Sequence, residues 1–78
     1  MSPEEILDVL QREAPEVNWV VDGDGYHNQV IGVSDVFEGL NAVKRQQYVY
    51  ALLNPYIMDG RLHAVSIKTM TPAEQDSI

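Results

Sequence analysis

Two Asp-Gly pairs, at residues 22–25, separate two β-rich segments of the sequence. The first segment covers residues 17–21 and the second covers residues 27–33. Asp-Gly pairs between strand-like segments are a strong signal for a β-hairpin, because both residues accept the backbone angles that a tight turn requires. The sequence therefore predicts an antiparallel pair of strands joined at this turn.

A third strand is predicted over residues 62–70, which alternate in character with a period of two. Its two predicted faces are His63, Val65 and Ile67 on one side, and Leu62, Ala64, Ser66 and Lys68 on the other. A histidine thus begins the strand. Whether it is a structural residue or a ligand is the main functional question that the sequence raises.

A first helix is predicted over residues 3–13. Ser2 is expected to be its N-cap, Pro3 takes the first helical position, and Glu5 stands where a capping box requires a glutamate. Pro15 blocks continuation of the helix, because proline has no N–H to donate.

Two further helices are predicted between the second and third strands. The first has Asn41 as its N-cap and runs to Leu53. Asn54 and Pro55 then interrupt it and begin a short helix that ends at Gly60.

The segment between these strands is about 28 residues long, which suffices for a crossover connection. A crossover between parallel strands is nearly always right-handed, so the third strand is expected beside the second and parallel to it. We therefore predict a single α+β domain over residues 1–78, in the order helix-strand-strand-helix-helix-strand, with a three-stranded mixed sheet and helices on one face. Phe37 is the expected apolar anchor of the link after the second strand. Residues 71–74 end the sheet, with one helical turn as an alternative there.

The composition argues against several classes of function. The net charge of −7 argues against general nucleic-acid binding, which needs a basic surface. The absence of cysteine excludes thiol catalysis and thiolate ligation by this chain alone. No serine stands in a nucleophile-elbow context, so an enzyme is not expected. No apolar run approaches 18 residues and the N-terminus lacks a signal-peptide layout, so a cytoplasmic protein without a membrane span is expected.

The two histidines begin neighbouring strands in this predicted sheet. His27 has the parity of Ile31 and Val33, and His63 has the parity of Val65. Both are expected on the same face at the same sheet edge, with their rings within roughly 10 Å, given the strand spacing. A histidine at a strand start is more often a hydrogen-bonded structural residue than a ligand. The pair also underfills a zinc site, which needs at least three protein ligands.

Several ordered motifs carry a resemblance to a known family. They are Phe37-Glu38-Gly39-Leu40, Val43-Lys44-Arg45-Gln46-Gln47 with Val49, His63-Ala64-Val65-Ser66-Ile67-Lys68-Thr69, and Thr71-Pro72-Ala73-Glu74. These segments resemble the BolA family, and most closely its IbaG-like acid-stress branch. The resemblance covers nearly the whole chain and implies a fold similar to a class II KH domain.

The resemblance implies a partner and a cofactor. BolA-like proteins pair with monothiol glutaredoxins that carry a Cys-Gly-Phe-Ser motif, and the heterodimer holds a bridging 2Fe-2S cluster. His63 matches the C-terminal histidine ligand of the family, and His27 falls where its second, more variable ligand stands. Glutaredoxin and glutathione would supply thiolates, while histidine can replace cysteine on one iron. Such a cluster is expected to be labile in acid, because a protonated histidine cannot bind metal. Asn28 departs from the family pattern, since relatives often carry an aromatic residue there.

Two other hypotheses remain open from the sequence. BolA proteins are also described as transcriptional regulators, and a nucleic-acid surface would here consist of Lys44, Arg45, Arg61 and Lys68. The net charge and the absence of a Gly-x-x-Gly loop count against that hypothesis. The alternative is an interaction module that docks on a glutaredoxin without metal. On its own the chain is expected to be a monomer or a weak homodimer.

Overall fold

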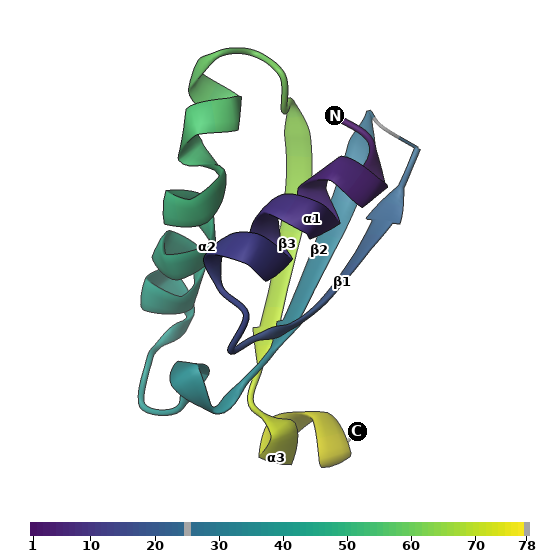
Figure 1. Ribbon diagram of the computed structural model, residues 1–78. Helices are drawn as coiled ribbons and strands as arrows, with labels where there is room; N and C mark the ends of the chain where they lie inside the picture. The colour runs from purple at the N-terminus through teal and green to yellow at the C-terminus, as the bar shows by residue number, and fades with distance from the viewer. Residues whose placement is uncertain (25, 78) are drawn as a thin grey trace.

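The computed structural model describes residues 1–24 and 26–77 and confirms a single α+β domain. Its elements are α1 (Pro3–Glu13), β1 (Asn18–Gly23), β2 (His27–Val33), the 3-10 helix η1 (Asp35–Phe37), α2 (Ala42–Met58), β3 (Ala64–Met70) and α3 (Pro72–Asp76) (Figure 1). Gly25, the last residue of the predicted turn, lies outside the described residues. No helix in the described ranges has both the length and the apolar character required to cross a bilayer.

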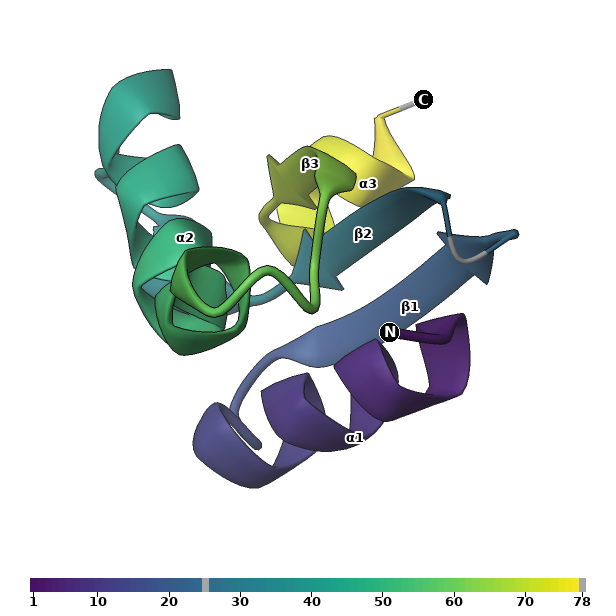
Figure 2. The ribbon, with the colours of Figure 1, turned by 90° about the horizontal axis from the view of Figure 1, so that it is seen from above.

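The sheet has the predicted mixed topology, with strand order β1-β2-β3. β1 and β2 are antiparallel, with Asn18 opposite Val33, and β2 and β3 are parallel, with His27 opposite Ala64. α1 and α2 lie on the same side of the sheet, and α3 lies beyond the end of β3 (Figures 1 and 2). The crossover through α2 therefore places the beginnings of β2 and β3 at one end of the sheet.

The core lies between this sheet and the two long helices. Its fully buried large side chains are Phe37, Ile6, Leu10, Leu53, Leu62, Val30 and Val49. Ser2 and Glu5 form the predicted capping box of α1, which directs its apolar stripe into this core. The prediction that Phe37 anchors the link after β2 is confirmed, because its side chain has no exposed surface.

The predicted interruption at Pro55 is wrong, because α2 continues through it to Met58. Leu53 is fully buried, and Tyr56 and Ile57 pack against the core, so the apolar stripe continues past the proline. The end of the helix is closed by the carbonyl of Tyr56, which accepts the N–H groups of Arg61 and Leu62 at 3.0 Å. A proline inside a helix destabilises it by about 3 kcal/mol, and the packing on both sides of Pro55 offsets this cost.

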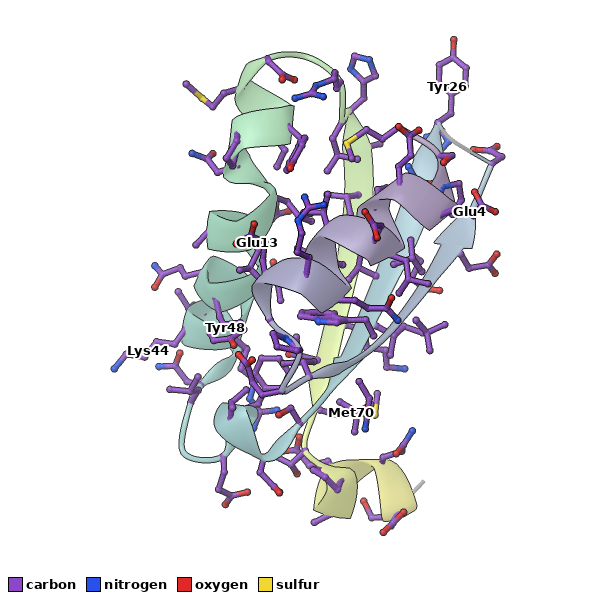
Figure 3. All side chains as sticks on the ribbon, viewed as in Figure 1. Glu4, Glu13, Tyr26, Lys44, Tyr48 and Met70 are labelled. Carbon is purple, nitrogen blue, oxygen red and sulfur yellow. The ribbon has the colours of Figure 1, made fainter. Side chains whose placement is uncertain are left out.

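Tyr48 connects α2 to the segment between α1 and β1. Its hydroxyl donates to Glu16 Oε1 at 2.6 Å, and Ser34 Oγ donates to the Glu16 carbonyl at 2.9 Å. Figure 3 shows the Tyr48 side chain pointing from α2 toward this segment. Burial, and then the bond to Glu16, raise the pKa of Tyr48 from its ordinary value of 10.0 to about 12.

Spectrophotometric titration tests this contact. Because the folded state favours the neutral phenol, the contribution of Tyr48 to stability is complete below pH 10 and is lost as the pH rises toward 12. Subtracting the tyrosinate absorbance curve of Tyr48→Phe from that of the wild type should leave one step near pH 12. A difference step near pH 10 in the folded protein would contradict the assignment.

Candidate functional site

The structure places the two histidines at the same end of the sheet, as predicted. His27 is the first residue of β2, and His63 directly precedes β3. Both are exposed. His27 pairs with Ala64, so the Cα atom of His63 lies within about 9 Å of that of His27, from a strand spacing of about 4.8 Å and about 3.8 Å between consecutive Cα atoms.

The prediction that the two histidines share one face in register is wrong by one residue. β3 begins at Ala64, and Ala64, not His63, stands opposite His27. Because side chains alternate along a strand, a shift of one residue exchanges the two faces. His27 therefore shares the helix-free face with Gln29 and Ser66, while His63 lies in the loop before the strand. The separation of the two rings stays a prediction.

β3 begins at Ala64 because Arg61 and Leu62 have partners outside the sheet. Leu62 is 2% exposed and packs in the core, and its N–H donates to the Tyr56 carbonyl. The carbonyl of Arg61 accepts a hydrogen bond from the amino group of Met1 at 2.8 Å. This loop is thus held from two sides, and it presents His63 immediately after a buried anchor.

The hairpin end that carries His27 is organised by Asp24. Its Oδ1 atom accepts the backbone N–H groups of both His27 and Tyr26 at 2.9 Å. These two bonds, first that to His27, lower the pKa of Asp24. The side chain of Tyr26, 75% exposed, extends away from the molecule (Figure 3). The backbone N–H groups of Tyr26 and His27 are therefore held by Asp24, while the side chains of these two residues face solvent.

Asn28 is a residue whose burial the sequence did not reveal. It is 3% exposed, and its side-chain nitrogen and oxygen have no hydrogen-bond partner among the described residues. Asn28 stands opposite Gly23 on β1 and Val65 on β3. A Cβ at Gly23 would lie 2.7 Å from Asn28 Oδ1, so the glycine leaves room for this amide. Buried positions alternate along β2, and this alternation could have indicated that Asn28 is buried. The polar side chain of Asn28 interrupts the apolar pattern at that position.

A shallow hollow of about 190 Å³ lies beside His27. Its lining residues are Asp22, Gly23, His27, Asn28, Gln29 and Ser66. No group of three or more histidine, cysteine or acidic side chains close enough to hold a metal occurs within residues 1–24 and 26–77. The two exposed imidazoles suit metal ligation chemically, although two ligands are fewer than the three that a protein zinc site needs.

The four basic residues predicted as a partner or nucleic-acid surface do not gather in one patch. Lys44 and Arg45 lie in the first turn of α2, whereas Arg61 lies beyond its far end. A rise of 1.5 Å per residue separates these ends by about 25 Å. Lys68 is on β3, and the side chain of Lys44 points away from the domain (Figure 3).

Both arginines of this set are engaged within the chain. Arg45 donates to Glu74 through two nitrogens, at 2.7 and 3.2 Å, and its Nε donates to the Leu40 carbonyl at 2.9 Å. Arg61 pairs with Asp59 at 2.7 Å and lies 4.9 Å from the centre of the Tyr56 ring. Arg45 therefore fastens α3 to α2, which explains a basic residue in the first turn of a helix.

Comparison with known sequences agrees with this architecture. Residues 5–74 match the family model described as BolA-like protein. The chain is 50% identical over 74 residues to the acid stress protein IbaG of Escherichia coli (strain K12). That alignment covers 95% of this chain and 88% of the relative.

Solved structures of BolA proteins share the fold. A bolA protein homologue from Coxiella burnetii superposes with a TM-score of 0.85 at 30% identity, over 97% of each chain. The BolA domain of SufE1 from Arabidopsis thaliana superposes with a TM-score of 0.77 at 35% identity, over 92% of this chain and 93% of the other. The resemblance inferred from the motifs is confirmed, and this chain belongs to the BolA family.

Proposed function

We propose that this protein is a non-enzymatic partner of a monothiol glutaredoxin, and that the two chains hold a bridging 2Fe-2S cluster between them. The observation that carries the proposal is the pair of exposed histidines at one end of the sheet, in a chain without cysteine. The bound cluster would make the heterodimer a carrier in iron–sulfur trafficking and iron homeostasis.

In this proposal each chain supplies what the other lacks. His63 and His27 present imidazole nitrogens to iron, and the glutaredoxin cysteine and glutathione supply thiolates. The buried anchor Leu62 and the bonds of Asp24 hold the two histidine backbones in place before the partner arrives. Ordered ligands lose less conformational entropy on binding, which favours assembly.

The proposal also accounts for a connection with acid stress. An imidazole must be neutral to bind metal, so acid competes directly with ligation by His63 and His27. A relative that is 50% identical to this chain over 74 residues is named an acid stress protein. We infer that this chain and its partner release the cluster in acid.

Reconstitution with a Cys-Gly-Phe-Ser glutaredoxin, glutathione, iron and sulfide tests the function. The wild-type heterodimer should give a visible circular dichroism spectrum distinct from that of the glutaredoxin alone. His63→Ala should reduce the yield of this species at least tenfold, and His63→Cys should restore a cluster with an altered spectrum. Gln11→Ala, an exposed position near the end of α1, is the control and should behave as wild type.

Two results would contradict the proposal. An unchanged cluster spectrum in His63→Ala would remove His63 as a ligand. The affinity of glutaredoxin should also be compared for the wild type and a variant that lacks both histidines, with and without cluster. Equal affinities would indicate that the chain docks on glutaredoxin without holding metal.

A further inference from the structure

One carboxylate oxygen fixes the backbone immediately before His27. Asp24 Oδ1 accepts the N–H groups of Tyr26 and His27, both at 2.9 Å. These are the last described residue of the turn and the first residue of β2. Two donors that share one acceptor cannot rotate independently, so the orientation of the His27 peptide follows the position of the Asp24 side chain.

The backbone on the other side of His27 is fixed by packing. Asn28 is 3% exposed, and its Cα lies so near Gly23 that a Cβ on the glycine would approach it to 2.8 Å. The same Cβ would collide with the His27 carbonyl oxygen. Gly23 also has a φ of +148°, which favours glycine. His27 is thus an exposed side chain on a backbone that is held at both of its ends.

We propose that Asp24 is a positioning residue that presents the His27 imidazole to the shared cluster, an inference that rests on the function proposed above. Groups that orient a metal ligand contribute to affinity without touching the metal. Asp24 acts on the backbone of the ligand, so the position of its oxygen is what matters, and its charge is secondary.

Asp22 provides a contrast within the same hairpin. It is also an exposed aspartate, but its Oδ1 atom accepts the N–H of Gly23 at 2.9 Å and does not bond to β2. Loss of Asp22 removes the same charge from the same turn and leaves both bonds to Tyr26 and His27 intact. A role for Asp24 in general turn electrostatics therefore predicts equal effects of the two aspartates, and a positioning role predicts unequal ones.

Four variants of the full chain separate these roles. Asp24→Asn keeps an oxygen acceptor and removes the charge, whereas Asp24→Glu keeps the charge and displaces the oxygen by one methylene. Asp24→Ala removes both, and Asp22→Ala is the matched control. The positioning role predicts wild-type behaviour for Asp24→Asn and Asp22→Ala, and the same loss in Asp24→Glu and Asp24→Ala.

Two measurements report on these variants. In the protein alone, amide hydrogen exchange at Tyr26 and His27 should be at least fivefold faster in Asp24→Ala and Asp24→Glu. In the reduced heterodimer, labelled with ¹⁵N-histidine, pulsed EPR should show two histidine nitrogens coupled to the cluster in the wild type. Asp24→Ala and Asp24→Glu should lose the coupling to the His27 nitrogen, which is identified by its absence in His27→Ala. Both variants should keep the coupling to the His63 nitrogen.

The possible results test the positioning role of Asp24 separately from the proposed shared cluster. Wild-type nitrogen couplings in both Asp24→Ala and Asp24→Glu would overturn the positioning role while leaving the shared cluster intact. Equal losses in Asp22→Ala and Asp24→Ala would overturn it as well. Absence of histidine coupling in the wild type would overturn the proposed function itself, and with it the assignment of Asp24 to that site.

Discussion

Phe37→Ala is expected to lower the free energy of unfolding by about 3–5 kcal/mol, as for other buried phenylalanines cut back to alanine. The side chain has no exposed surface and lies where η1 ends beneath the core. Its ring meets that of Tyr48 edge to face, with centroids 5.5 Å apart at an interplanar angle of 83°. A 78-residue domain has about 4–12 kcal/mol of stability in total, so this change removes a large part of it.

Urea denaturation followed by far-ultraviolet circular dichroism measures this effect. The midpoint should fall by more than 1 M, given a slope of roughly 1–3 kcal/mol per molar urea. Val36→Ala is the matched control, since Val36 is the neighbouring residue of η1 and is 38% exposed. Its effect should be much smaller than that of Phe37→Ala. Equal midpoints for wild type and Phe37→Ala would show that Phe37 is not the anchor of this segment.

Much of the fold could be predicted because local signals and topology agree. Ser2, Pro3 and Glu5 predict the start of α1, and the structure has a capping box there. The Asp-Gly turn predicts an antiparallel pair, and the long helical connection then requires β3 to run parallel to β2. These predictions are confirmed because they depend on local sequence and chain connectivity, and not on side-chain contacts.

The inferences that failed depend on contacts between distant residues. Pro55 is a helix breaker in isolation, yet burial of Leu53 and packing of Tyr56 carry α2 past it. The alternation of residues 62–70 continues across the true start of β3, so nothing in the pattern shows that Leu62 turns into the core. The pattern therefore predicts that the strand begins with His63, whereas β3 begins at Ala64.

The same limit applies to the candidate site. The topology alone places His27 and His63 at one end of the sheet. It cannot show that Asp24 accepts the backbone N–H of His27, or that the buried Asn28 amide has no hydrogen-bond partner among residues 1–24 and 26–77. Nor does a basic residue in the sequence reveal that Arg45 is occupied by Glu74, 29 positions later. The sequence could suggest the candidate ligands His27 and His63, but it could not reveal the contacts that surround them.

Gly32→Ala is expected to cost about 1–3 kcal/mol, because it overpacks the sheet beneath Trp19. Trp19 stands opposite Gly32, and a Cβ at Gly32 would lie 2.7 Å from Cζ3 and 3.1 Å from Cε3 of the indole. The indole is 6% exposed, and its Nε1 donates to the Ala14 carbonyl at 3.0 Å, so it is not free to move aside. Because Trp19 is the only tryptophan, a change in its fluorescence would report altered packing around the indole.

A double-mutant cycle distinguishes this steric clash from a loss of backbone propensity. Phenylalanine at position 19 is shorter than the indole and leaves room for the added methyl group. Gly32→Ala should therefore cost at least 1 kcal/mol less in a Trp19→Phe background than in the wild type, a coupling of the size found for residues in contact. An equal cost in both backgrounds would place the effect in the backbone of β2 or in the contact with Val17, whose Cγ1 would lie 3.2 Å from the added Cβ. A smaller cost of Gly32→Ala in the Trp19→Phe background would show that glycine is required at position 32 because the indole packs over it.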